Sequence, residues 1–100
     1  MIYLISYDIK SDKIRLKIAK KLLEYGLERI QFSVFLGMVK DSLLPTFKNQ
    51  LKEIFKKADL TSDKLLMIPM TRNQLKKYAT FEGNVPDFDY LCGDVLVLIL

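Results

Sequence analysis

The first eight residues, MIYLISYD, are an apolar run that ends abruptly in a carboxylate, Asp8. Ile, Leu and Tyr dominate the run, which is typical of a buried strand, and Ser11 and Asp12 behind it are good helix caps. We therefore expect Asp8 where a buried strand leaves the core. A carboxylate at such a point either caps backbone amides at the start of the following helix, pairs with a cation such as Arg29, or binds a metal ion.

The composition limits the chemistry that side chains can supply. The chain has no histidine and one cysteine, Cys92. A serine–histidine triad, an intramolecular disulfide and a cysteine-based zinc site are therefore excluded. Any catalysis must use carboxylates, tyrosines and basic residues, together with a hard cation such as Mg²⁺ or Mn²⁺.

One carboxylate is a poor magnesium site, and no second acid stands at motif spacing from Asp8. A two-fold dimer would bring two copies of Asp8 to one axis. Two close carboxylates repel each other unless a cation or a shared proton lies between them. A metal ion held there would activate water and stabilise the charge of a phosphodiester transition state.

Charge is distributed unevenly along the chain. Residues 1–77 carry all 16 Lys and Arg against eight acids, for a net charge of +8, whereas residues 78–100 carry four acids and no base, for −4. A basic body favours polyanionic partners, although scattered lysines are most often only a solvated surface. Arg15 and Arg29 are candidates for gripping phosphate, because a guanidinium group bonds two phosphate oxygens at once. The alternatives are a solvated Arg15 and a salt-bridged Arg29.

Hydrophobic periodicity predicts the elements that position these residues. Helices are expected over 12–25, ended by Gly26, and from a cap at Asp41 or Ser42 through the apolar face that ends at Phe55. Thr71 and Gln74 resemble a capping box for a short helix to Tyr78. Strands are expected over 2–8, 64–70 and 94–100, and residues 28–39 form either one long strand or a hairpin around 31–33.

With a hairpin in 28–39, the order is strand, helix, two strands, helix, strand. This order is that of the α+β ferredoxin-like split βαβ fold, an antiparallel sheet with both helices on one face. Residues 1–100 are expected to form a single domain. The extra C-terminal strand, VLVLIL, is apolar on both faces, so we expect it to pair with a second protomer's sheet. Segment 79–100 would then pack on the partner protomer of a homodimer.

Three segments carry a resemblance to a known family: the opening YLISYDI, a basic helix ending in YGLERIQFSVFLG, and a later LLMIPMTRNQL. In this order and spacing they are similar to the small CRISPR-associated endonucleases of the adaptation module, the second of the Cas proteins. The resemblance covers about residues 1–83, and the last seventeen residues match less distinctively. It implies two strands in 28–39 and a dimer with exchanged C-terminal strands.

The resemblance also implies the residues of a site. Asp8 from each protomer would be the metal ligand, and Tyr7 would lie near the active site as the second catalytic residue. Nucleic-acid binding would fall to Arg15, Lys17, Arg29, Ser33 and Phe35. Family members commonly have arginine where Lys17 stands, and lysine keeps the charge but lacks the bidentate fork. Phe35 is expected to pack in the core rather than stack on a base.

Two functions follow from the resemblance. The first is a dimeric magnesium-dependent endonuclease that cuts RNA or DNA during spacer acquisition for antiviral defence. The second is a non-catalytic bridge between copies of the CRISPR integrase, which would hold protospacer duplex DNA. A ferredoxin-like RNA-binding module is a third possibility, and aromatics exposed on the sheet would favour it. The sequence has no signal-peptide pattern and no apolar run long enough to span a bilayer, so we expect a cytoplasmic protein without membrane association.

Overall fold

The computed structural model describes residues 1–84 of the chain. Its elements are β1 (Ile2–Asp8), α1 (Asp12–Glu24), β2 (Glu28–Gln31), β3 (Val34–Met38), the 3₁₀ turn η1 (Asp41–Leu43), α2 (Leu44–Phe55), β4 (Lys64–Met70) and α3 (Arg72–Tyr78). The predicted final strand over 94–100 and Cys92 lie outside the described residues. No helix within residues 1–84 is long and apolar enough to cross a membrane.

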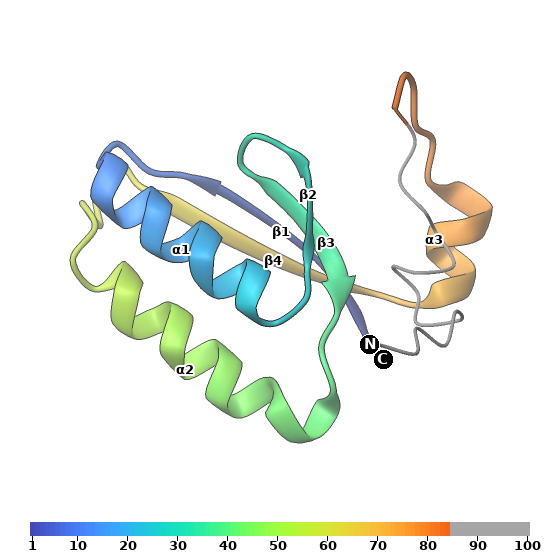
Figure 1. Cartoon of the computed structure of the whole chain (residues 1–100), viewed down its shortest axis with the longest axis horizontal. Helices are drawn as coiled ribbons and strands as arrows, with labels where there is room; N and C mark the ends of the chain where they lie inside the picture. The colour runs from blue at the N-terminus through green and yellow to red at the C-terminus, as the bar shows by residue number, and fades with distance from the viewer. Residues whose placement is uncertain (85–100) are drawn as a thin grey trace, which may run out of the picture.

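The four strands form one sheet in the order β2-β3-β1-β4, and all neighbouring strands are antiparallel. Helices α1 and α2 lie side by side over one face of this sheet (Figure 1). Residues 28–39 form the hairpin β2–β3 with its turn at 32–33, rather than one long strand. The α+β ferredoxin-like fold with both helices on one face is therefore confirmed.

Strand β1 lies in the middle of the sheet, and its side chains alternate between the two faces. Tyr3, Ile5 and Tyr7 point toward α1 and α2 and belong to the main core. In the same core, Ile18 and Phe47 are fully buried. The even-numbered residues of β1 point to the other side, which we call the open face, and Asp8 is the last of them.

The ends of α1 follow from local sequence. The Ser11 hydroxyl accepts a hydrogen bond from the Ile14 amide at 3.3 Å, so Ser11 is the N-cap. At the other end the Leu27 amide donates to the Leu22 carbonyl at 3.1 Å across Gly26, whose φ is +85°. This Schellman arrangement needs a left-handed residue, which glycine adopts without strain.

The predicted N-terminal caps of α2 and α3 have different outcomes. Neither Asp41 nor Ser42 caps α2, because 41–43 form the turn η1 and α2 begins without a side-chain cap, with Pro45 in its first turn. The capping box of α3 is confirmed. Thr71 and Gln74 exchange hydrogen bonds of 3.1 and 2.9 Å between side chain and backbone.

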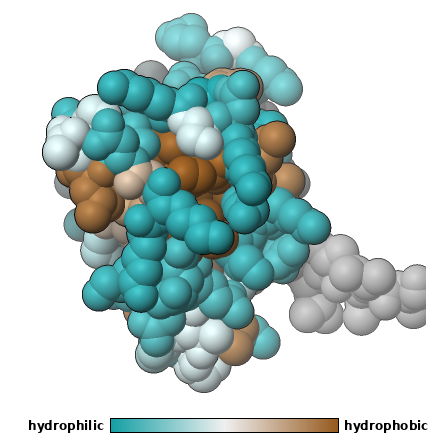
Figure 2. All heavy atoms as spheres, turned by 90° about the vertical axis from the view of Figure 1, so that its left-hand side faces the viewer, coloured by the Kyte–Doolittle hydropathy of each residue, from teal (hydrophilic) through white to brown (hydrophobic). Residues whose placement is uncertain are grey.

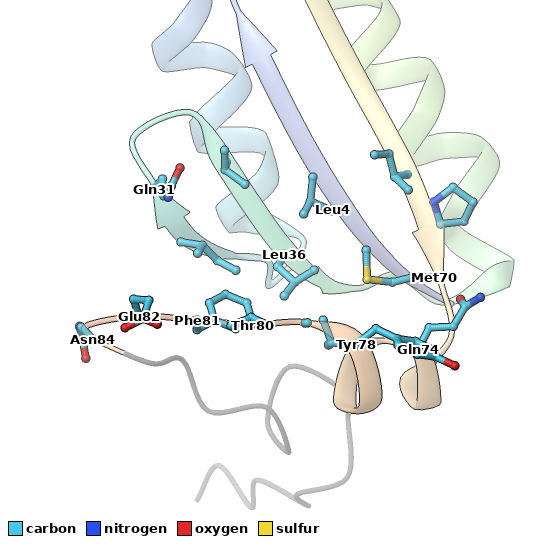
Figure 3. A pocket seen from close by; sticks show the side chains of 16 residues that line it. Leu4, Gln31, Leu36, Met70, Gln74, Tyr78, Thr80, Phe81, Glu82 and Asn84 are labelled. Carbon is cyan, nitrogen blue, oxygen red and sulfur yellow. The ribbon is translucent and has the colours of Figure 1, made fainter.

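The described residues cover only part of the open face of the sheet. Helix α3 and the segment that follows it to Asn84 pass beneath one end of the sheet, with Phe81 on the side of Leu36 (Figure 3). The hollow between them has a volume of about 830 Å³. On β4, Leu66 is 55% exposed, and Ile68, which lines this hollow, is 41% exposed. Large apolar side chains on this face therefore still contact solvent.

Candidate active site

Asp8 is the last residue of β1, and its side chain is exposed on the open face. Within residues 1–84 its carboxylate forms no ion pair and accepts no hydrogen bond. Ser11 caps α1 in its place, and Arg29 lies against aromatic rings. Neither structural alternative for Asp8, the helix cap or the Arg29 pair, is therefore present among the described residues.

The surroundings of Asp8 are set by the two elements beside the end of β1. Lys64 is its register partner on β4, so a cation lies across the strand pair from the carboxylate. On the other side, the Tyr7 amide donates a 3.1 Å hydrogen bond to the Ser33 carbonyl in the β2–β3 turn. Figure 2 views the molecule from this end, where hydrophilic side chains surround a small apolar area.

Tyr7 lies on the opposite face of the sheet from Asp8. Its ring is buried and stacks on Phe35, with 6.2 Å between the ring centroids. Tyr7 also lines a surface hollow of about 330 Å³ between α1 and the β2–β3 turn, together with Arg15 and Arg29. The two residues predicted to be catalytic therefore point to different faces, although they are neighbours in the chain.

The two predicted phosphate-binding arginines have different roles in the described fold. Arg15 donates to the carbonyl of Ile9 at 2.9 Å and of Lys10 at 3.3 Å, and it pairs with Asp12. These interactions tie the side chain of Arg15 to the connection between β1 and α1 and stabilise that connection. The guanidinium carbon of Arg29 lies 5.1 Å from the ring centroid of buried Phe35, so the exposed Arg29 has a rigid support.

The remaining predicted residues do not gather at one point. Lys17 is exposed on α1 and lines a cleft of about 280 Å³ between α1 and α2 with Lys57. Phe35 is fully buried, as the core alternative expects. Ser33 is half-buried in the turn, and its backbone carbonyl is the atom that reaches β1. Of the predicted nucleic-acid set, only Arg15 and Arg29 line one hollow with Tyr7.

Sequence reasoning missed Asp63, which lies in the loop between α2 and β4 and is 8% exposed. Its carboxylate accepts hydrogen bonds from the amides of Lys10 at 3.1 Å and of Asp59 at 3.0 Å. It therefore ties this loop to the connection that follows Asp8. Nothing in the local sequence separates Asp63 from an ordinary solvated loop acid, because its main partner is 53 residues away.

Asp59, in the same loop, has an ordinary local explanation. The hydroxyl and amide of Thr61 and the hydroxyl of Ser62 donate to its carboxylate at 2.6 to 3.0 Å. These hydrogen bonds, the Thr61 hydroxyl first, hold the pKa of Asp59 below its usual value. The loop is thus ordered by two acids that both accept bonds from protein groups.

Asp8 offers one carboxylate to a divalent cation, and the other described acids do not join it. No group of three or more acids, cysteines or histidines suited to a metal lies within residues 1–84. Mg²⁺, however, is commonly bound by one or two carboxylates and keeps several waters alongside substrate phosphate. The exposed Asp8 carboxylate, which accepts no hydrogen bond within residues 1–84, would suit such an ion as one of its ligands.

Fold and site together define a small ferredoxin-like α+β domain with an exposed carboxylate at the end of its central strand, unpaired among residues 1–84. The model of one family, CRISPR associated protein Cas2, matches residues 1–78. The chain belongs to this family.

Curated relatives and solved structures agree with this assignment. A protein of Pyrobaculum aerophilum named CRISPR-associated endoribonuclease Cas2 2 is 46% identical over 63 residues, covering 61% of this chain and 69% of its own. The CRISPR-associated endoribonuclease Cas2 of Aeropyrum pernix is 33% identical over 88 residues, covering 87% and 92%. The crystal structure of Streptococcus pyogenes Cas2 at pH 6.5 has a TM-score of 0.66 at 25% identity, covering 82% of this chain and 100% of that chain.

Proposed function

We propose that this protein is a dimeric, metal-dependent endonuclease that hydrolyses phosphodiester bonds of RNA or DNA in CRISPR spacer acquisition. The observation that carries the proposal is the exposed Asp8 carboxylate, which has no protein partner within residues 1–84. The names of the curated relatives, CRISPR-associated endoribonucleases, support a nuclease. Mg²⁺ or Mn²⁺ would be the cofactor, because an oxygen ligand suits a hard cation.

Dimer formation is supported by the outer edge of β4. The backbone amide of Tyr7 forms its hydrogen bond on the β3 side of β1. Because the backbone N–H and C=O groups of successive residues alternate between the two neighbouring strands, those of the even-numbered residues of β1 point toward β4. Their partners are the even-numbered residues of β4, which leaves the backbone groups of Leu65, Met67 and Pro69 directed to the outer edge. Pro69 lacks an N–H, so its place on this side is that expected of an edge strand. No described strand pairs with this edge.

The two surfaces beside this edge would suit an apolar strand. On the helix side, Phe55 of α2 and Met67 of β4 line a groove of about 240 Å³. On the open face, Leu66 and Ile68 are exposed. A strand added along β4 places alternate side chains on these two sides, and VLVLIL is apolar at every position. We therefore assign this edge to residues 95–100 of a second protomer.

In such a dimer, the role of the chain's own residues is to hold charge and position substrate. Two Asp8 carboxylates would face each other and share the cation. The bound cation would lower the pKa of a water molecule and stabilise the charge that develops on the phosphate. Lys64, across the strand pair from Asp8, would attract the phosphodiester to the site.

The test compares Asp8→Asn with Asp41→Asn, an exposed acid in η1. We expect Asp8→Asn to abolish metal-dependent cleavage of single-stranded RNA and of duplex DNA while the protein stays folded, dimeric and able to bind duplex DNA. Asparagine keeps the side chain's shape but removes the charge that holds the cation.

Melting temperature without metal gives an independent readout on the same preparation. Asp8→Asn should melt no lower than wild type, because it removes repulsion between two facing carboxylates. Asp41→Asn should leave cleavage unchanged. Retained cleavage by Asp8→Asn would reject the catalytic assignment.

A second candidate function is a non-catalytic bridge that binds duplex DNA and a CRISPR integrase, and the exposed lysines of the helix layer favour it. Lys13, Lys17 and Lys57 are all exposed on or next to α1 and α2, away from the open face. Replacing all three by Gln should weaken duplex binding and reduce the salt dependence, by up to about 0.9 in the log–log slope per lost phosphate contact. Single replacements, which serve as controls, should do little. An unchanged slope in the triple variant would show that DNA binds elsewhere.

A further inference from the structure

Phe32 stands at the turn of the β2–β3 hairpin with 73% of its surface exposed. Packing does not account for a large aromatic ring there, because hairpin turns ordinarily take small polar residues or glycine. A lone exposed apolar residue is itself unremarkable on a protein surface. Phe32 differs in what lies beside it, since the guanidinium carbon of Arg29 is 5.9 Å from its ring centroid.

The ring borders the hollow of about 330 Å³ that Tyr7, Arg15 and Arg29 also line. Leu16 of α1, which is 70% exposed, is a further apolar side chain in the lining. Ala19 and Asp12 also line the hollow, and the Asp12 carboxylate is paired with Arg15. The volume is at the lower end of the range for small-molecule sites, roughly 300–1,000 Å³. An exposed aromatic face, an aliphatic side chain and an exposed guanidinium group therefore share one small hollow.

The guanidinium group of Arg29 is supported by two aromatic rings. The guanidinium carbon of Arg29 lies 5.1 Å from the ring centroid of Phe35, which is fully buried, and 5.9 Å from that of exposed Phe32. A guanidinium group placed this way is oriented before any ligand arrives, which reduces the entropy lost when it bonds a phosphate. The hollow thus offers one surface for a flat ring and one fixed donor group for an anion.

We propose that Phe32 is a stacking platform for one unpaired nucleobase, with Arg29 holding the adjoining phosphate. Aromatic stacking accepts every base, but a base inside a duplex has both faces covered by its neighbours. The hollow would therefore select single strands or frayed ends over closed duplex. The inference rests on the proposed function, in that the ligand is a nucleic acid.

The position of the hollow connects this selection to Asp8. The carbonyl of Ser33, next to Phe32, accepts the 3.1 Å bond from the Tyr7 amide. The turn is therefore fastened beside the end of β1, one residue before the carboxylate. A nucleotide held in the hollow would place the next part of its strand at the sheet end where Asp8 is exposed. Phe32 would act as a residue that determines specificity, without touching the reacting atoms.

The experiment measures binding of short RNA and DNA single strands that carry one 2-aminopurine, and of a closed hairpin duplex, with EDTA present to prevent cleavage. Stacking of 2-aminopurine on an aromatic ring quenches its fluorescence. The variants are Phe32→Ala, Phe32→Leu, which keeps an apolar side chain without a π face, and Phe32→Trp, which restores one. Leu43→Ala, an exposed apolar residue of η1 that is 47% exposed, is the matched control.

We expect Phe32→Ala and Phe32→Leu to weaken single-strand binding by about 5- to 150-fold and to lose the quenching. Phe32→Trp and Leu43→Ala should bind like wild type, and duplex affinity should not change in any variant. Circular dichroism should show all variants folded, because residue 32 is largely exposed. If the Phe32 variants lose affinity for RNA and DNA single strands equally, the base alone is recognised. If only one of the two is affected, the same platform also contacts the sugar.

Three results would overturn the inference. Equal binding of single strands by wild type and Phe32→Ala would show that the ring contributes nothing. Full binding by Phe32→Leu would show a hydrophobic contact without stacking. Equal losses on single strand and duplex would remove the selectivity. If wild type bound no nucleic acid at all, the proposed function itself would fail, and that result differs from each of these three.

Discussion

Replacing Asp63 by Ala should destabilise the fold more than any other single change to an acidic side chain in the described loops. Asp63 is 8% exposed, and its carboxylate accepts one amide from Lys10 and one from Asp59. Alanine would leave both backbone N–H groups without an acceptor in a partly buried place. The bond to Lys10 also joins two loops that are far apart in the sequence, so nothing local replaces it.

The size of the loss follows from these two contacts. A hydrogen bond to a charged group contributes about 1.5–3 kcal/mol, and leaving a buried donor unsatisfied costs about 1–3 kcal/mol. Because water reaches part of the loop, we expect Asp63→Ala to lower the free energy of unfolding by about 2–4 kcal/mol in total, near the lower end of the sum for the two lost hydrogen bonds. Asp63→Asn keeps one acceptor oxygen but turns an NH₂ group toward the second donor, so it should lose about half as much.

Urea denaturation followed by circular dichroism, at one fixed protein concentration, would measure both variants against wild type. For a domain of this size, 1 kcal/mol corresponds to a shift in melting temperature of about 4–8 °C, so thermal melting gives an independent check. Asp41→Asn, an exposed acid with no side-chain hydrogen bond among those described, is the control. A loss below about 0.5 kcal/mol for Asp63→Ala, which is the range of ordinary surface substitutions, would refute this account of the loop.

Two further changes test the sheet. Deleting residues 95–100 should convert the dimer into monomers or aggregates, because the edge of β4 and exposed Leu66 and Ile68 would lose their proposed cover. Light scattering after gel filtration measures this change, and an unchanged soluble dimer would contradict strand exchange. Gly37→Ala should lower the free energy of unfolding by about 1–3 kcal/mol, since a Cβ there would lie 2.9 Å from the Leu27 Cα, a backbone atom that cannot move aside. If the variant unfolded as wild type does, the hairpin and the α1–β2 connection would have to move apart without cost.

Most elements of the fold could be predicted because their signals are local. The apolar run before Asp8, the glycine at 26 and the capping box at Thr71 depend on residues within a few positions of each other. The start of α2 was predicted wrongly for the same reason. Asp41 and Ser42 have good capping side chains, but the chain forms η1 there, and the competing turn is not visible in propensities.

The sequence by itself excluded chemistry based on histidine or on an intramolecular disulfide, and it placed Asp8 at the end of a buried strand, since composition and pattern need no neighbours. Only the tertiary structure decided what surrounds Asp8. Strand β4 brings Lys64 beside it across the strand pair. The hairpin brings Phe32 and Arg29 to the hollow at Tyr7, and the loop after α2 brings Asp63 to Lys10. These contacts join residues far apart in the chain, and they exist only after the sheet has paired, because each depends on a register that no local preference encodes.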